Sequence, residues 1–165
     1  MASLAMMAAR GLRLRAVSRF WQTPAFPAGS GPDYVNAVAL VETDMNADNV
    51  LKVLHEVEFE LGRTRDGRRW QARGVDLDLL ALDDMVLPSA EQQDEWRNLP
   101  LARQAVEAPS RLILPHPRMQ DRAFVLVPLA EIAPDWHHPR TGLTVTQMRD
   151  ALKPAAFEGM KLAET

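Results

Sequence analysis

Two aspartates, Asp76 and Asp78, stand in an apolar run directly after a loop that is rich in arginine. Residues 75–82 alternate in a pattern that predicts a buried strand, and side chains at i and i+2 of a strand lie on one face. Carboxylates this close repel each other unless cations lie between them, and their hard oxygen atoms suit Mg²⁺. The pair therefore predicts a site for divalent cations that arrive with a polyphosphate.

Guanidinium groups crowd residues 63–73, just before the aspartates, at Arg63, Arg65, Arg68, Arg69 and Arg73. Arginine binds phosphate oxygens through a planar fork of N–H donors, so this loop is suited to the rest of a polyphosphate. Each feature alone has an ordinary explanation, because a D-x-D pair can lie on a solvated edge and arginines can lie in an exposed turn. Together they predict a Mg²⁺–nucleotide site. The sequence has no G-x-x-x-x-G-K-[ST] loop, so a P-loop nucleotide site is not supported.

Composition is ordinary for a soluble globular protein, with 47% hydrophobic and 25% charged residues among 165. The net charge of −3 does not favour general attraction to nucleic acid or to an anionic membrane. No apolar run approaches the roughly 18 residues of a membrane span. The absence of cysteine excludes disulfides and thiolate chemistry. We therefore expect a cytoplasmic monomer that binds neither nucleic acid nor membrane.

The order of the predicted elements indicates one α+β domain over residues 1–165. We expect the end of a helix at residues 3–9, stopped by Gly11, and then strands at 12–21 and 34–42 that pair antiparallel. A helix is expected over 47–61, with Asp44 or Asn46 as its N-cap. Its apolar stripe at helical spacing is Val50, Leu54, Val57 and Leu61.

The second half of the sequence is predicted to be mostly helical. Residues 83–110 are polar and form an insertion, either a flap or a surface helix near 90–107 that Pro100 interrupts. A short strand and loop are expected over 111–122, and helices over 123–132 and 144–152. His137 and His138 are expected to be exposed.

Several stretches, taken in order, carry a family resemblance. They are SRFWQTP at 18–24, YVNA at 34–37, EFELGR at 58–63, RWQAR at 69–73, DLDLL at 76–80, LPHPRM at 114–119, RAF at 122–124, PL at 128–129 and EIAP at 131–134. In this order and spacing, between about Arg15 and Trp136, the sequence resembles the 6-hydroxymethyl-7,8-dihydropterin pyrophosphokinase family of folate biosynthesis.

The resemblance implies a ferredoxin-like antiparallel sheet with helices packed on it, and transfer of pyrophosphate from ATP to the hydroxymethyl group of a reduced pterin, with release of AMP. It implies two Mg²⁺ ions held by Asp76 and Asp78, which with Arg65 and Arg73 would be the catalytic residues. The implied ATP-binding residues are His55, Glu58, Trp70, Arg111, His116 and Arg122. The implied pterin-binding residues are Thr23, Pro24, Tyr34, Asn36 and Phe124.

Residue chemistry agrees with the implied pterin pocket, since a flat heterocycle needs an aromatic face and an amide at its edge. For Tyr34 and Phe124, core packing is the ordinary alternative. Asn36 is a stronger indication of a binding pocket than these aromatic residues, because an amide within an apolar strand needs hydrogen-bond partners.

The sequence departs from the family pattern at its start. Members open with an apolar strand and a Gly-Ser-Asn loop, so here the fold is expected without that first strand. Either the true start lies upstream of Met1, or the chain is an inactive remnant. A rival from another class is a ferredoxin-like RNA-binding module with Phe20, Trp21 and Tyr34 as stacking aromatics, against which the negative net charge argues.

Overall fold

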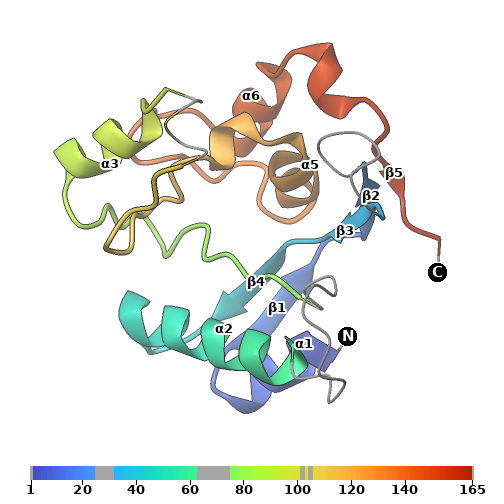
Figure 1. The fold of residues 1–165 in the computed structure, drawn as a ribbon, viewed down its shortest axis with the longest axis vertical. Helices are drawn as coiled ribbons and strands as arrows, with labels where there is room; N and C mark the ends of the chain where they lie inside the picture. The colour runs from blue at the N-terminus through green and yellow to red at the C-terminus, as the bar shows by residue number, and fades with distance from the viewer. Residues whose placement is uncertain (1, 25–31, 63–74, 101–102, 104–105, 165) are drawn as a thin grey trace. The chain divides into compact units, whose positions relative to one another are not determined.

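The structure, a computed structural model, describes residues 2–24, 32–62, 75–100, 103 and 106–164 (Figure 1). It divides into two compact units, Met1–Arg15 with Val41–Leu80 and Ala16–Leu40 with Ala81–Thr165, which are described separately. Helices and antiparallel strands confirm the predicted α+β class. The finer expectations, one ferredoxin-like sheet and one domain with an insertion at 83–110, stay predictions. Among the described residues, no helix has both the length and the apolar character needed to span a membrane.

The first unit begins with α1 (Ala2–Ala9), which ends before Gly11 as predicted. Gly11 adopts a φ of +88°, a left-handed conformation that costs glycine little. The strand β1 (Arg13–Val17) then pairs with β4 (Ala39–Glu42). Arg15 on β1 forms an ion pair with Glu42 on β4, so charged side chains lie along one side of this two-stranded sheet.

Each of the two predicted long strands is interrupted. The first ends at Val17 and resumes as β2 (Trp21–Thr23), and the second divides into β3 (Tyr34–Asn36) and β4. The cause is Ser18, whose N–H donates to the Val38 carbonyl and whose hydroxyl accepts the Val38 N–H, both at 2.9 Å. A side chain that takes a backbone N–H in this way stops a regular ladder on both strands at the same place.

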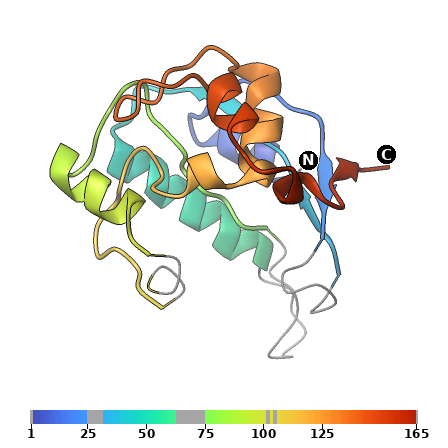
Figure 2. The same cartoon turned by 90° about the horizontal axis from the view of Figure 1, so that it is seen from above.

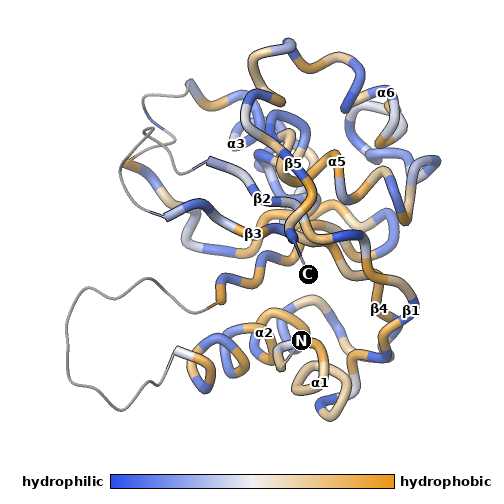
Figure 3. Tube along the Cα trace, turned by 90° about the vertical axis from the view of Figure 1, so that its right-hand side faces the viewer, coloured by the Kyte–Doolittle hydropathy of each residue, from blue (hydrophilic) through white to orange (hydrophobic). Residues whose placement is uncertain are grey.

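The helix α2 (Ala47–Gly62) matches its prediction closely. Asn46 is the N-cap, since its side-chain oxygen accepts the Asn49 N–H at 2.9 Å. The buried side chains of α2 pack against α1, and polar and apolar residues intermix along the helix in Figure 3. The buried core of this unit is formed by Met7, Leu12, Val50, Leu54 and Val57.

The predicted strand at residues 75–82 is wrong, because residues 75–82 form no regular strand in the structure. A strand needs a neighbour that accepts and donates along its backbone, but the Leu77 N–H donates to the side chain of Glu58 instead. The predicted alternation of burial nevertheless holds over residues 75–79, whereas residues 80–82 are all half-buried. Leu77 and Leu79 pack against the core, whereas Asp76 and Asp78 are exposed.

The second unit contains a three-stranded sheet in the order β3-β2-β5, where β5 is Lys161–Leu162. β2 and β3 pair antiparallel, as predicted, with Trp21 opposite Asn36 and Thr23 opposite Tyr34. The helix α5 (Ala123–Ile132) contacts both of these strands and packs beside α6 (Val145–Asp150) (Figure 2). The remaining elements are α3 (Ala90–Arg97), η1 (Met119–Asp121) and η2 (Pro154–Phe157).

His138 is fully buried, so the expectation that it is exposed is wrong, whereas His137 is exposed as expected. His138 organises the turn before α6, because its carbonyl accepts the Thr141 and Gly142 N–H groups. Its Nδ1 atom accepts the Arg140 N–H at 3.1 Å. Burial, followed by the charges of Arg97 and Arg140, lowers the pKa of His138 from 6.5 to about 4, despite the opposing effect of Asp94.

This buried histidine predicts a loss of stability in weak acid. The unfolded chain binds the proton near pH 6.5 and the folded chain only near pH 4. The free energy of unfolding should therefore fall as the pH drops from 6.5 to 4, by up to about 3 kcal/mol from this group. His138→Asn, which keeps an acceptor for the Arg140 N–H, should flatten that pH dependence in urea unfolding. The control His137→Asn should keep the wild-type slope, and an unchanged slope in His138→Asn would contradict the assignment.

Candidate active site

The paired aspartates are positioned by a hydrogen bond to α2. The Leu77 N–H, between Asp76 and Asp78, donates to Glu58 Oε1 at 2.6 Å. Burial raises the pKa of Glu58, and the neighbouring Asp76 carboxyl raises it further, while the Leu77 N–H and His55 act in the opposite direction. The arrangement concentrates carboxyl groups at one place, which favours binding of a cation.

The donor set at the aspartates fits Mg²⁺. In the part of the chain that the structure describes, no group of three or more histidine, cysteine, aspartate or glutamate side chains could hold a metal ion by itself. Mg²⁺ usually binds through one or two carboxylates and takes its other ligands from phosphates and water. Asp76 and Asp78, both exposed, provide that number of oxygen ligands.

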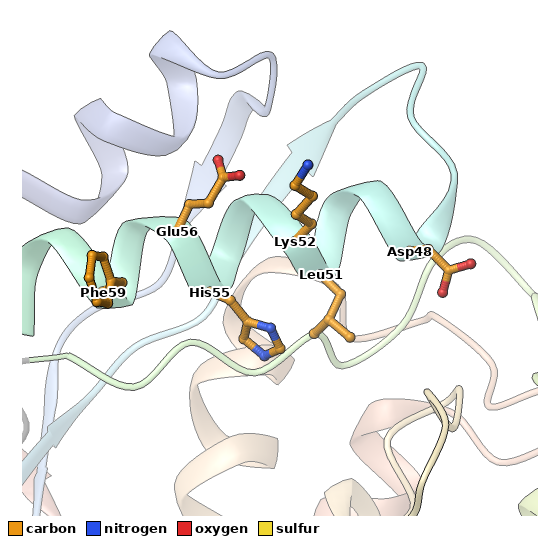
Figure 4. Close-up of a pocket in the computed structure, with 6 residues that line it drawn as sticks. All are labelled: Asp48, Leu51, Lys52, His55, Glu56 and Phe59. Carbon is orange, nitrogen blue, oxygen red and sulfur yellow. The ribbon is translucent and has the colours of Figure 1, made fainter.

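His55 lies one turn before Glu58 on α2, beside a shallow hollow of about 400 Å³. Figure 4 shows the six side chains that line this hollow along the helix, with His55 and Leu51 projecting on the same side. Phe59 is 63% exposed, so the hollow has an aromatic margin as well as an imidazole.

Thr23 and Asn36, two predicted pterin residues, are brought together by the β2–β3 pairing. The Asn36 side-chain amide donates to Thr23 Oγ1 at 2.8 Å, and Thr23 is only 6% exposed. The partner that a half-buried amide requires is therefore another predicted site residue. This bond fixes the orientation of the amide, whose other edge can read a donor–acceptor pattern.

The two aromatic residues that were predicted to bind the pterin, Tyr34 and Phe124, are exposed, so core packing is not favoured for them. Tyr34 is 62% and Phe124 is 38% exposed. Phe124 is the second residue of α5, and the Arg122 guanidinium carbon lies 5.5 Å from the centre of its ring. This contact presents a flat cation and a flat ring together at the start of the helix.

His116 lies in a loop that is otherwise well buried. Leu114 pairs with Leu87 through two backbone hydrogen bonds of 2.9 and 3.2 Å, and Pro115 is fully buried. His116 Nδ1 accepts the Arg118 N–H at 3.2 Å, so the neutral ring carries its proton on Nε2. Arg111 is exposed just before this loop. The imidazole is thus set up as a hydrogen-bond donor.

Three predicted residues, Arg65, Trp70 and Arg73, lie outside the described residues. The others form two groups, each within one unit. Asp76, Asp78, Glu58 and His55 belong to the first unit, and Thr23, Pro24, Tyr34, Asn36, Arg111, His116, Arg122 and Phe124 belong to the second.

Sequence reasoning missed the role of Glu131 in the second group. Its carboxylate accepts the Arg19 N–H at 2.8 Å, the Arg19 guanidinium at 3.1 and 2.8 Å, and Trp21 Nε1 at 3.0 Å. These bonds tie α5, which carries Phe124, to β2, which carries Thr23. Because the partners are more than a hundred residues apart, no local pattern could have revealed them.

Comparison with known proteins agrees with these features. The family described as 7,8-dihydro-6-hydroxymethylpterin-pyrophosphokinase (HPPK) matches residues 1–134. A protein of Synechocystis that is named 2-amino-4-hydroxy-6-hydroxymethyldihydropteridine pyrophosphokinase is 36% identical over 147 residues. Proteins of the same name in Methylorubrum extorquens and Pseudomonas aeruginosa are 35% identical over 148 residues and 34% identical over 149 residues. The chain therefore belongs to the HPPK family.

The matched regions cover most of this chain and differing shares of its relatives. They span 89% of this chain and 63% of the Synechocystis protein. They span 90% of this chain against both other relatives, with 79% of the Methylorubrum protein and 76% of the Pseudomonas protein.

Gly159 gives a stability test at the margin of the second group. It adopts a φ of +74°, and a Cβ atom there would collide with Pro24 Cγ. Gly142 adopts a similar φ of +71° with nothing within 4 Å, so it is a matched control for backbone strain alone.

Gly159→Ala should destabilise the protein more than Gly142→Ala, because it adds displacement of Pro24 to the same strain. We expect an excess of about 1–3 kcal/mol in urea unfolding followed by tryptophan fluorescence. Equal losses in the two variants would show that Pro24 yields without cost and is not held in place by Gly159.

Proposed function

We propose that the chain transfers a pyrophosphoryl group from ATP to the hydroxymethyl oxygen of 6-hydroxymethyl-7,8-dihydropterin and releases AMP. The supporting observation is the outward-facing pair Asp76 and Asp78, held by the Leu77 to Glu58 hydrogen bond within the region that matches the HPPK family. Its relatives are named pyrophosphokinases for this substrate.

In this proposal, Asp76 and Asp78 hold the Mg²⁺ ions that accompany ATP, and two ions are expected. When bound, Mg²⁺ supplies positive charge that neutralises the phosphate oxygens. Glu58 keeps the backbone between the aspartates in place through its bond to Leu77. Arg65 and Arg73 are proposed to neutralise the charge that develops on the transferred group.

The nucleotide is proposed to contact residues that offer cations and hydrogen-bond donors. His55 lies at the hollow along α2 (Figure 4), and His116 offers Nε2–H because its Nδ1 is already an acceptor. Arg111, Arg122 and Trp70 complete the proposed set.

The pterin is proposed to stack on exposed aromatic side chains and to form hydrogen bonds, along its edge, with a side-chain amide. Tyr34 and Phe124 offer the faces, and Asn36, oriented by Thr23, offers the amide. Pro24 follows Thr23 directly and borders the same place. A pocket of this kind selects a flat heterocycle with donors and acceptors on its edge.

Positioning and charge neutralisation would do most of the catalytic work. The hydroxymethyl oxygen attacks the β-phosphorus of ATP, the bond from that phosphorus to the oxygen bridging to the α-phosphate breaks, and AMP leaves with the electron pair. The hydroxyl proton passes to solvent, and we assign no general base. Phosphoryl transfer needs little covalent help from side chains, so aligned substrates and nearby cations suffice.

For its setting, we propose a cytoplasmic monomer whose partners are the two small-molecule substrates, without nucleic acid or membrane. The net charge of −3 supports the part of this proposal that concerns nucleic acid and membrane.

The metal-site assignment predicts a large loss of turnover without loss of the fold. Asp76→Ala or Asp78→Ala should lower AMP formation by at least about a hundredfold, because metal-dependent charge neutralisation is removed. Asp84→Ala, which removes an equally exposed carboxylate, is the control and should keep wild-type turnover. The assay follows AMP by liquid chromatography with Mg²⁺, ATP and the pterin, and thermal unfolding checks the fold.

Wild-type turnover in either Asp76→Ala or Asp78→Ala would refute their role as metal ligands. A wild-type chain that forms no AMP but binds RNA with steep salt dependence would instead support the RNA-binding alternative. A wild-type chain that binds neither ATP, pterin nor RNA would be the inactive remnant.

A further inference from the structure

The helix α3 buries one side chain fully among its residues Ala90–Arg97, and that side chain is polar. Gln93 is 0% exposed, whereas the rest of this very polar helix is exposed or half-buried. A surface helix normally packs through an apolar stripe, so hydrophobic burial does not explain why Gln93 faces inward. A buried amide is unfavourable unless it makes hydrogen bonds. Among the described residues the Gln93 Oε1 atom has no partner, so the bond made by its Nε2 atom must explain its place.

Gln93 contacts the loop that carries His116. Its Nε2 atom donates to the Pro115 carbonyl at 3.1 Å, immediately before His116. Leu87, which precedes α3, also holds this loop, because it pairs with Leu114 through two backbone hydrogen bonds. Two consecutive residues before His116 are therefore fixed by residues 87–93, within the stretch expected to be an insertion.

The helix that carries Gln93 is itself held firmly. Ser89 caps its start by accepting the Gln92 N–H at 3.3 Å. Asp94 accepts Arg140 Nη2 at 2.6 Å and Nε at 3.2 Å, and it also accepts Arg97 Nη2 at 2.7 Å. Because these two arginines hold Asp94 from both sides, the pKa of its carboxyl lies well below its usual range. Side-chain hydrogen bonds therefore hold α3 both at its start and at Asp94.

We propose that Gln93 is a positioning residue for the nucleotide, acting through the Pro115 carbonyl to fix the His116 ring. This inference rests on the proposed function, which places His116 at ATP. The Nδ1 atom of His116 is already engaged by the Arg118 N–H, so the direction of Nε2–H depends on where this loop backbone lies. Gln93 holds that backbone through a side chain that is fully buried.

The test compares Gln93→Met with Gln92→Met. Methionine matches glutamine in length and volume but lacks the N–H donor, and Gln92 is an exposed neighbour on the same helix. We expect Gln93→Met to raise the KM for ATP about fivefold to tenfold, as loss of one buried hydrogen bond would. The dissociation constant for the pterin should change little, the thermal midpoint should fall by a few degrees at most because the Pro115 carbonyl loses its donor, and Gln92→Met should resemble wild type throughout.

A second readout follows His116 directly, through its ring C–H resonance in the NMR spectrum of the whole chain. The chain has four histidines, so His116 can be assigned by substitution. We expect this resonance to shift in Gln93→Met and to stay in place in Gln92→Met. Gln93→Asn has an amide that is one methylene too short to reach Pro115, so it should behave like Gln93→Met. If Gln93→Met does not fold, Gln93→Asn replaces it in both measurements.

Wild-type values of both the ATP KM and the His116 resonance in Gln93→Met would overturn the inference. Equal weakening of ATP and pterin binding would overturn it too, because that pattern indicates a general structural loss. A wild-type chain without AMP formation would refute the proposed function, and the His116 resonance would still decide whether Gln93 positions the ring.

Discussion

The hydrogen bond from the Leu77 N–H to Glu58 fixes how residues 75–80 lie on the first unit. A bond from a backbone N–H to a carboxylate contributes about 1.5–3 kcal/mol, which is enough to hold a segment that has no regular strand. Leu77 and Leu79 then pack against the core of α1 and α2, so Asp76 and Asp78 face outward. This hydrogen bond and the packing of Leu77 and Leu79 together place residues 75–80 on the first unit.

The same contact carries an electrostatic cost. Partial burial and the adjacent Asp76 carboxyl both raise the pKa of Glu58, which means that negative charge is disfavoured there. A cation at the aspartates would relieve that repulsion. The proposed divalent cation is compatible with the exposure of both aspartates and with the raised pKa of Glu58.

Local patterns predicted the helices well and the strands poorly. Asn46 and the stripe of Val50, Leu54 and Val57 specify α2 within the chain itself, so its bounds agree with the structure. The interruption at Ser18 depends on Val38, twenty residues away, and no periodicity reports it. The burial of His138 was not predicted, because it goes with a turn in which the Thr141 and Gly142 N–H groups donate to the His138 carbonyl.

For the candidate site, the sequence revealed residue types but not the residues that hold them. The pairing of Thr23 with Asn36 joins two residues that the family resemblance implies for one pocket, and the alternation around Leu77 correctly indicated that Asp76 and Asp78 are exposed. The supports Glu131 and Gln93 were not found, because each acts on a distant segment through a single side chain.

The most direct measurement uses Mn²⁺ in place of Mg²⁺, with a non-hydrolysable ATP analogue, and follows paramagnetic broadening of backbone amides by NMR. The account predicts that the amides of Asp76, Leu77 and Asp78 broaden first, and only when the nucleotide is present. Broadening that begins elsewhere, or that persists after both aspartates are changed to asparagine, would contradict it.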